Sequence, residues 1–150
     1  MSPGRLPEGI SLGLQQKLYL GNLEAKRDWG YAGDYVDAMW RILQHSEPGD
    51  FVVATGESHS VREFLDLAAE YAGVEWSRHV EMDPRYLRPS EVDHLLGDAA
   101  KARSFLGWKP KVGFQQLVRM MLEHDLELAR QEQTLTNAGH RVVARGTAHA

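Results

Sequence analysis

The sequence predicts an α/β fold, because it contains two strand-like runs that are each followed by a helix-like segment. Residues 50–55, DFVVAT, are compact, apolar and rich in β-branched side chains, which is typical of a strand buried on both faces. With residues 17–20 and 79–82, three candidate strands are predicted. These are too few for a complete doubly wound sheet, so part of a larger fold is expected to be missing from this chain.

The N-terminal part starts with a stretch rich in Pro and Gly. Residues 1–10 are expected to form a disordered lead-in. Residues 17–20 alternate weakly and predict a short strand, closed by a turn at Gly21-Asn22. Residues 23–31 are expected to be irregular.

Residues 34–44 predict the first helix. Asp34 is an acid in its first turn, where it favours the positive end of the helix dipole. Large apolar side chains fall at helical spacing and predict one inner face. They are Val36, Met39, Trp40 and Leu43.

The second helix is predicted from residue 60 to about residue 72. Ser60 and Glu63 have the spacing of a capping box, and Gly73 is a stop signal. Its buried face is expected to consist of Val61, Phe64, Leu65, Ala68 and Tyr71.

The C-terminal half predicts two more helices. Asp98 is expected to cap a short helix that ends near Gly107. The longest helix is predicted from Phe114 to about Gln131, and residues 133–150 are expected to form a flexible tail. Residues 11–132 would then form one folded domain.

The composition of the chain argues against several classes of function. The chain has 150 residues, 43% hydrophobic and 25% charged, which is ordinary for a soluble globular protein. A net charge of -4 argues against non-specific nucleic-acid binding. The absence of cysteine excludes disulfides and thiolate metal sites. Since no signal peptide or transmembrane run is present, no membrane partner is expected and a cytoplasmic location is predicted.

No recognisable set of catalytic or metal-binding groups occurs in the sequence. There is no G-x-G-x-x-G fingerprint, no P-loop, no G-x-S-x-G elbow and no Tyr followed four residues later by Lys. The seven histidines do not cluster, and no metal-ligand spacing is found. The chain is therefore expected to carry no catalytic, cofactor-binding or metal-binding residues of its own.

Arg27 and Arg88 are the best candidates for binding an anion. A guanidinium can hold a phosphate through two parallel hydrogen bonds, which a lysine cannot do. Each arginine has an aromatic residue nearby in the sequence, Trp29 and Tyr86 respectively. Charged loop residues are usually just solvated, so two surface arginines are the alternative interpretation.

Glu91 and Asn22 are further polar candidates. Glu91 lies three residues after Arg88 and could accept hydrogen bonds from ribose hydroxyls. An acid in the first turn of a helix is an equally good interpretation. Asn22 could contact a ligand, although a structural turn asparagine is the plainer interpretation.

Four runs between about residues 11 and 131 resemble one enzyme family. They are LYLGNLEAKRDWGYAGDYVDAMW, DFVVATGESHSVREF, DPRYLRPSEVDHLLGD and LGWKP. LGNLEAKRDWG together with YLRPSEVD resembles GDP-mannose 4,6-dehydratase, of the extended short-chain dehydrogenase/reductase superfamily. The resemblance implies that this chain is the C-terminal, substrate-binding part of such an enzyme and that the N-terminal Rossmann domain is missing.

The resemblance also implies a substrate and a cofactor. Members of the family bind NADP in the Rossmann domain and GDP-mannose in the C-terminal domain, and convert GDP-mannose to GDP-4-keto-6-deoxymannose, a precursor of fucose. The family's NADP loop and catalytic residues lie upstream of the matched part. The chain alone is therefore expected to be inactive, with a missing Rossmann half or a homo-oligomer as its partner. A GDP-sugar-binding module without turnover and a non-functional remnant are the alternatives.

The resemblance assigns site residues by position. Arg27 and Arg88 match arginines that contact the nucleotide diphosphate, and Glu91 matches an acid near the ribose. Lys17 and Leu18 begin the segment that lies along the guanine. These assignments agree with the residues selected above for their chemistry.

Overall fold

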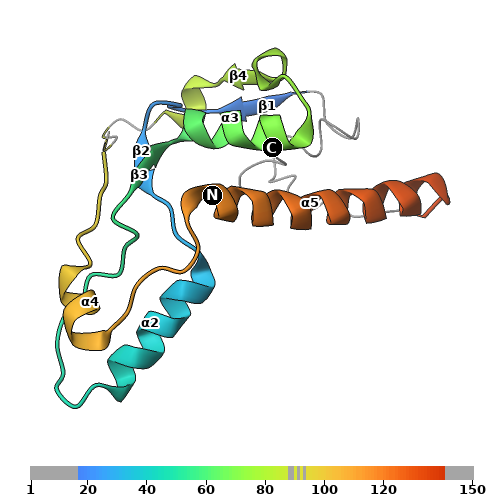
Figure 1. Ribbon diagram of the computed structural model, residues 1–150. Coiled ribbons are helices and arrows are strands. Elements are labelled where there is room, and N and C mark those ends of the chain that lie inside the picture. The colour runs from blue at the N-terminus through green and yellow to red at the C-terminus, as the bar shows by residue number, and fades with distance from the viewer. Residues whose placement is uncertain (1–16, 88–89, 91, 93, 141–150) are drawn as a thin grey trace. The chain divides into compact units, whose positions relative to one another are not determined.

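The computed structural model describes residues 17–87, 90, 92 and 94–140 (Figure 1). The chain divides into two compact units. The first comprises Met1–Leu23, Arg62–Pro89 and Val118–Ala150, and the second comprises Glu24–Val61 and Ser90–Leu117. Each unit contains helices and strands, so the predicted α/β class is confirmed. In the part of the chain described, no helix is long and apolar enough to cross a membrane.

The first unit contains a two-stranded parallel ladder. β1 (Leu18–Leu20) pairs with β4 (Val80–Met82). The sequence predicts both strands but not their pairing. The turn after β1 requires glycine, because a Cβ on Gly21 would lie 2.6 Å from the carbonyl oxygen of Tyr86. That carbonyl belongs to a short 3-10 helix, η2 (Pro84–Tyr86), which follows β4. A second 3-10 helix, η1 (Trp76–Arg78), precedes β4.

Helix α3 (Val61–Ala72) has the predicted limits. It begins directly after Ser60 and is followed by Gly73, whose φ of +68° is the left-handed conformation that ends many helices. The prediction of its buried face is wrong for Tyr71, which is exposed and donates its hydroxyl to Glu123 at 2.7 Å. The buried residues of α3 are Phe64, Leu65, Ala68 and Ala69.

Helix α5 (Phe114–Asn137) runs further than predicted. Residues 133–137 are helical, whereas the sequence assigns them to a tail. They are largely exposed, so local hydrogen bonding rather than packing extends the helix; Thr134 Oγ1 also donates to the carbonyl of Arg130 at 2.9 Å. Beyond the helix, Gly139 has a φ of +81°.

The second unit contains a short antiparallel ladder. β2 (Lys26–Asp28) pairs with β3 (Ser58–Ser60), with Arg27 opposite His59. The prediction of irregular structure for residues 23–31 is therefore wrong at β2. Charged residues are poor strand signals, and this pairing depends on a contact distant in sequence. The carboxylate of Asp28 binds the turn that leads into β3.

The core of the second unit is built on small side chains. Helices α2 (Ala32–Gln44) and α4 (Ala100–Leu106) contribute Ala38 and Ala102 to a cluster with Ala99 and Trp108. The N-cap residue of α4 is Ala99 rather than the predicted Asp98, but Asp98 still accepts a hydrogen bond from the backbone N–H of Ala100 at 2.8 Å.

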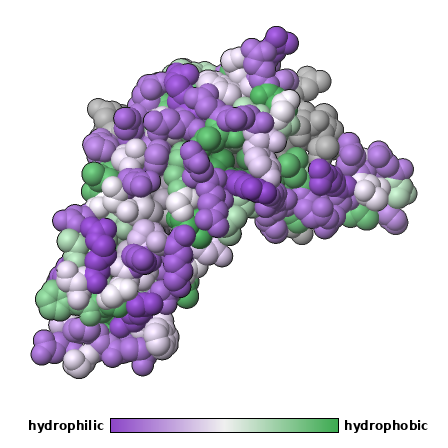
Figure 2. All heavy atoms as spheres, viewed as in Figure 1, coloured by the Kyte–Doolittle hydropathy of each residue, from purple (hydrophilic) through white to green (hydrophobic). Residues whose placement is uncertain are grey.

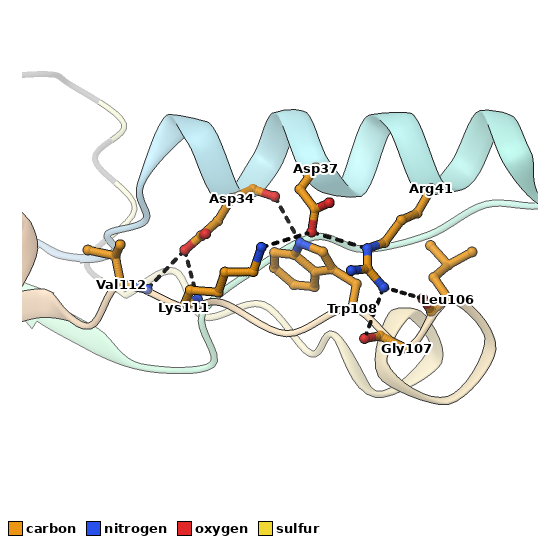
Figure 3. Close-up of polar contacts among 8 residues, drawn as sticks. All are labelled: Asp34, Asp37, Arg41, Leu106, Gly107, Trp108, Lys111 and Val112. Carbon is orange, nitrogen blue, oxygen red and sulfur yellow. Dashed lines mark hydrogen bonds and ion pairs between the residues drawn. The ribbon is translucent and has the colours of Figure 1, made fainter.

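Asp34 and Trp108 join α2 to the segment after α4 (Figure 3). The indole Nε1 of Trp108 donates to the carbonyl oxygen of Asp34 at 2.8 Å. The buried carboxylate of Asp34 accepts backbone hydrogen bonds from Lys111 at 2.8 Å and Val112 at 3.0 Å. Arg41 donates to the carbonyl of Leu106 at 3.0 Å. Trp108 is thus a core residue, a role that the sequence leaves open.

The predicted inner face of α2 is wrong. Its four large apolar side chains are between 60% and 80% exposed, namely Val36, Met39, Trp40 and Leu43. Helical spacing identifies an apolar side of a helix, but it cannot say which of two apolar sides is covered. Here Ala38 and the partly buried Tyr35 face the cluster.

The apolar run at residues 50–55 is not a paired strand. Among the described residues, no backbone hydrogen bond joins Phe51, Val52, Val53 or Ala54 to another segment. Among the residues that the structure describes, no strand lies beside this run, so the predicted strand does not form a ladder. Phe51 and Val53 still pack against the core cluster.

Candidate functional site

Three residues predicted to bind a ligand lie at β1 in the first unit. The side chain of Leu18 is buried. Lys17 Nζ lies 2.6 Å from a carboxylate oxygen of Glu81, in an exposed ion pair. Such pairs are worth about 0–1 kcal/mol, so Lys17 can exchange this partner for a ligand. Asn22 is half-buried in the turn that follows the strand.

Arg27 in the second unit is anchored to the backbone. Its Nη1 donates to the carbonyls of Lys26 at 2.7 Å and Val92 at 2.6 Å. A guanidinium carries its donors in a fixed fork, so bonds through one nitrogen orient the whole group. The other predicted residues, Arg88 and Glu91, precede Val92 in the sequence but lie outside the described residues.

Aromatic rings lie on the same face of the ladder as Arg27. Directly opposite residues in an antiparallel ladder point to the same face, and Arg27 is opposite His59. The His59 ring stacks on Phe114, with centroids 3.9 Å apart and planes 3° apart. Trp29 Nε1 donates to the His59 carbonyl at 2.9 Å. These contacts restrict movement of the ladder that carries Arg27.

The contributions of His59 and Phe114 could not be read from local sequence patterns. The two residues are far apart in the chain, and no motif connects them. Trp29, in contrast, could be selected from the sequence, but only because it stands two residues after Arg27.

Asp28 binds two further segments to β2. Its carboxylate accepts hydrogen bonds from the Thr55 hydroxyl at 2.7 Å, the Thr55 N–H at 2.8 Å, the Gly56 N–H at 3.0 Å and the Gly97 N–H at 3.4 Å. Burial raises the pKa of Asp28, but these hydrogen bonds together lower it by more, so the pKa lies below its usual value. Asp28 is therefore ionised at neutral pH and positions the backbone beside Arg27.

Replacing Asp28 with Asn is expected to lower the free energy of unfolding at pH 7 by about 1 kcal/mol, because an amide keeps only one acceptor oxygen. The folded-state pKa is depressed, so ionised Asp28 stabilises the fold above its unfolded pKa of about 3.9. This stabilisation is lost as the pH falls through the folded-state pKa. Urea unfolding at pH 7 and at low pH should show the difference between the two proteins shrinking with acid.

Asp50→Asn, which changes an exposed carboxylate in the same unit, is the control. It should leave the stability at pH 7 nearly unchanged. A stability difference between wild type and Asp28→Asn that stays constant down to acid pH would contradict the role assigned to the carboxylate.

The described residues around Arg27 provide groups for binding rather than for reaction. They offer a fixed cation, aromatic rings and backbone held by Asp28. Within residues 17–87, 90, 92 and 94–140, no group of three or more acidic or histidine side chains could hold a metal ion. The arrangement is suited to holding an anion at Arg27.

Comparisons with known sequences show close relatives. The family model described as GDP-mannose 4,6 dehydratase matches residues 5–121. GDP-mannose 4,6 dehydratase 1 of Arabidopsis thaliana is 61% identical over 131 residues, which cover 87% of this chain and 36% of the relative. The human GDP-mannose 4,6 dehydratase is 49% identical over 138 residues, covering 81% of this chain and 37% of the relative. The chain thus spans little more than a third of the length of these relatives.

Solved structures share the fold. RMD from Pseudomonas aeruginosa, complexed with NADPH, has a TM-score of 0.71 and 28% identity, covering 81% of this chain and 40% of that chain. UDP-glucose 4-epimerase of Thermus thermophilus, in complex with NAD, has a TM-score of 0.64 and 34% identity, covering 79% and 37% respectively. The matched region is therefore about two-fifths of each of these dinucleotide-bound proteins.

Proposed function

Because the chain belongs to the GDP-mannose 4,6-dehydratase family, we propose that it supplies the GDP-mannose subsite of such a dehydratase. The proposed reaction of the complete enzyme is the conversion of GDP-mannose to GDP-4-keto-6-deoxymannose. The observation that carries the proposal is the anchored guanidinium of Arg27, beside stacked rings, in a chain of this family.

Arg27 would hold the diphosphate of GDP-mannose. Hydrogen bonds between a guanidinium and a phosphate are charge-assisted and can be bidentate. Since Arg27 is already oriented by two backbone carbonyls, little side-chain freedom is lost when the ligand binds. Arg88 would contact the same diphosphate, and Glu91 would contact the ribose. The guanine would lie along the segment with Lys17, Leu18 and Asn22.

NADP is the proposed cofactor of the complete enzyme, where it would accept and return a hydride. The described residues of this chain do not fit it. A dinucleotide site needs a glycine-rich turn at a helix N-terminus so that the backbone can approach the pyrophosphate. Helix α3 follows β3 directly, but the junction SHSV contains no glycine. The chain alone would therefore bind the sugar nucleotide without turnover.

Isothermal titration calorimetry of the chain with GDP-mannose tests this function. Binding should be measurable and should weaken as the salt concentration rises, because the contact with the diphosphate is ionic. UDP-glucose, which has the same diphosphate but a different base and sugar, is the matched control and should bind more weakly. Absence of binding by GDP-mannose in low salt would refute the proposed subsite.

A further inference from the structure

The cross-strand neighbour of Arg27 is His59. The two residues lie directly opposite each other in the β2–β3 ladder, where the Cβ atoms of opposite residues are about 4.5–5.5 Å apart. Side chains alternate between the two faces of a strand, so Lys26 and Asp28 lie on the other face of the ladder. His59 is therefore the side chain of β3 that stands beside the stem of the arginine.

The ring of His59 is held in place by an aromatic side chain from another segment. Phe114, the first residue of α5, is buried and stacks on the imidazole with centroids 3.9 Å apart and planes 3° apart. The phenyl ring thus covers one face of the imidazole and restricts its rotation. Trp29 is tilted against Phe114 with centroids 6.3 Å apart, and its Nε1 donates to the carbonyl of His59 at 2.9 Å. These contacts fix both the ring and the backbone of His59.

The two hydrogen bonds of Arg27 act on the tip of a long side chain. Its Nη1 donates to the carbonyls of Lys26 and Val92. The methylene groups between Cα and the guanidinium make no hydrogen bond, so their conformation depends on what packs beside them. An arginine has many rotamers, and fixing one of them costs side-chain entropy. A fixed ring across the ladder removes some of the other rotamers, because the stem cannot enter the space that the ring occupies.

We propose that His59 is a positioning residue for Arg27. Its stacked ring stands across the ladder and limits the arginine stem to rotamers in which the guanidinium reaches Val92. The anion then meets a guanidinium that is already in place, so less side-chain freedom is lost on binding. The inference rests on the proposed function, because the anion would be the diphosphate of GDP-mannose.

The flat ring of His59, rather than a charge, would carry this role. Its Nε2 lies 3.6 Å from Oε2 of Glu57, a pairing that requires a protonated imidazole. The side chain of Glu57 is 68% exposed, and an exposed ion pair is worth little. The stack on Phe114, in contrast, needs only a planar aromatic ring. Phenylalanine should therefore replace His59 in this role, whereas alanine should not.

A double-mutant cycle, measured by calorimetric titration with GDP-mannose, tests the proposal. His59→Ala should lower the affinity by about two- to tenfold, the effect of leaving one long side chain unrestrained before binding. In the Arg27→Ala background the same substitution should change the affinity by less than about twofold, because its effect passes through Arg27. A residue that contacts the ligand itself, or that only holds the fold, would lower the affinity in both backgrounds. His59→Phe should bind as tightly as the wild type.

The order of the Arg27 side chain is a second readout, and it needs no ligand. The heteronuclear NOE of its Nε–Hε group should fall in His59→Ala and stay at the wild-type level in His59→Phe. Circular dichroism of each variant checks that it folds. If His59→Ala does not fold, His59→Leu takes its place, because it keeps apolar volume without a flat ring and should show the same losses.

His45→Ala is the matched control, because it removes another histidine from contact with a phenylalanine in the same unit. The ring of His45 meets Phe51 edge-on with centroids 5.9 Å apart, outside the β2–β3 ladder. This pair belongs to the part that carries α2 and α4, where apolar spheres reach the surface among hydrophilic ones (Figure 2). The substitution should leave both the affinity and the NOE of Arg27 unchanged.

Three results would overturn the proposal. They are an equal loss of affinity in both backgrounds, an unchanged NOE of Arg27 in His59→Ala, and a loss of affinity in His59→Phe. If the wild type did not bind GDP-mannose, the proposed subsite would fail, whereas a fall of the NOE in His59→Ala would still support the positioning of Arg27 by His59.

Discussion

Replacing Trp108 with Ala is expected to destabilise the second unit by about 3–5 kcal/mol, the usual range for removing a buried Trp. Trp108 is the largest of the fully buried side chains and packs with Ala38, Ala99 and Ala102. The three alanines cannot fill the space that the indole leaves. The substitution also removes the donor to the carbonyl of Asp34, where the segment after α4 is held (Figure 3).

The measurement is urea unfolding followed by far-UV circular dichroism, with hydrogen exchange of α2 and α4 as the local readout. Trp108→Phe is the matched control, because it keeps most of the apolar volume and loses the hydrogen bond. It should cost clearly less than Trp108→Ala. If the two variants were equally stable, filling of the core by the indole would not be what holds this unit together.

Replacing Arg27 with Ala is expected to weaken GDP-mannose binding by about 1.5–3 kcal/mol, the range for a hydrogen bond to a charged group. This corresponds to a loss of affinity of roughly 10- to 150-fold. The fold should be retained, because Arg27 is only partly buried and lies outside the core cluster. Arg27→Lys should recover only part of the affinity, because an ammonium cannot bind a phosphate through two parallel bonds.

Calorimetric titration of each variant measures this effect. Arg103→Ala is the control, since it removes an exposed arginine from α4 in the same unit. Its affinity for GDP-mannose should equal that of the wild type. If Arg27→Ala bound GDP-mannose as tightly as Arg103→Ala, Arg27 would not be the diphosphate contact.

Elements with local signals could be predicted from the sequence. The limits of α3 and α4 follow from residues next to them, because Gly73 and Gly107 adopt positive φ and Asp98 binds the first turn of α4. β1 and β4 were recognisable from short apolar runs. Their pairing with each other was not recognisable, because the sequence of a strand does not identify a partner strand that is distant in the chain.

Features that depend on distant contacts could not be predicted. β2 consists of Lys-Arg-Asp and pairs with β3, which is distant in sequence; Asp28 also binds the turn before β3. Stacking of His59 on Phe114 likewise joins segments without a common motif. Residues 50–55 show the opposite case. Their apolar, β-branched pattern is typical of a strand, but no strand pairs with them in the described part of the chain.

The candidate site was predicted in part. Arg27 was selected for its guanidinium and its neighbour Trp29, and the structure shows how both are held. The bonds of Asp28 were not anticipated, since an acid next to an arginine suggests a surface ion pair rather than four hydrogen bonds to other segments. The assignments of Arg88 and Glu91 lie outside the described residues and stay predictions.

A two-dimensional amide NMR spectrum of the chain, recorded with and without GDP-mannose, tests the central claim most directly. The proposed subsite predicts dispersed peaks and ligand-induced shifts concentrated at Arg27, at its neighbour His59 and at Val92, with free mannose producing none. Dispersed peaks that GDP-mannose leaves unmoved would mean a folded unit without the subsite. Collapsed peaks unaffected by ligand would contradict the proposal that this chain alone binds a sugar nucleotide.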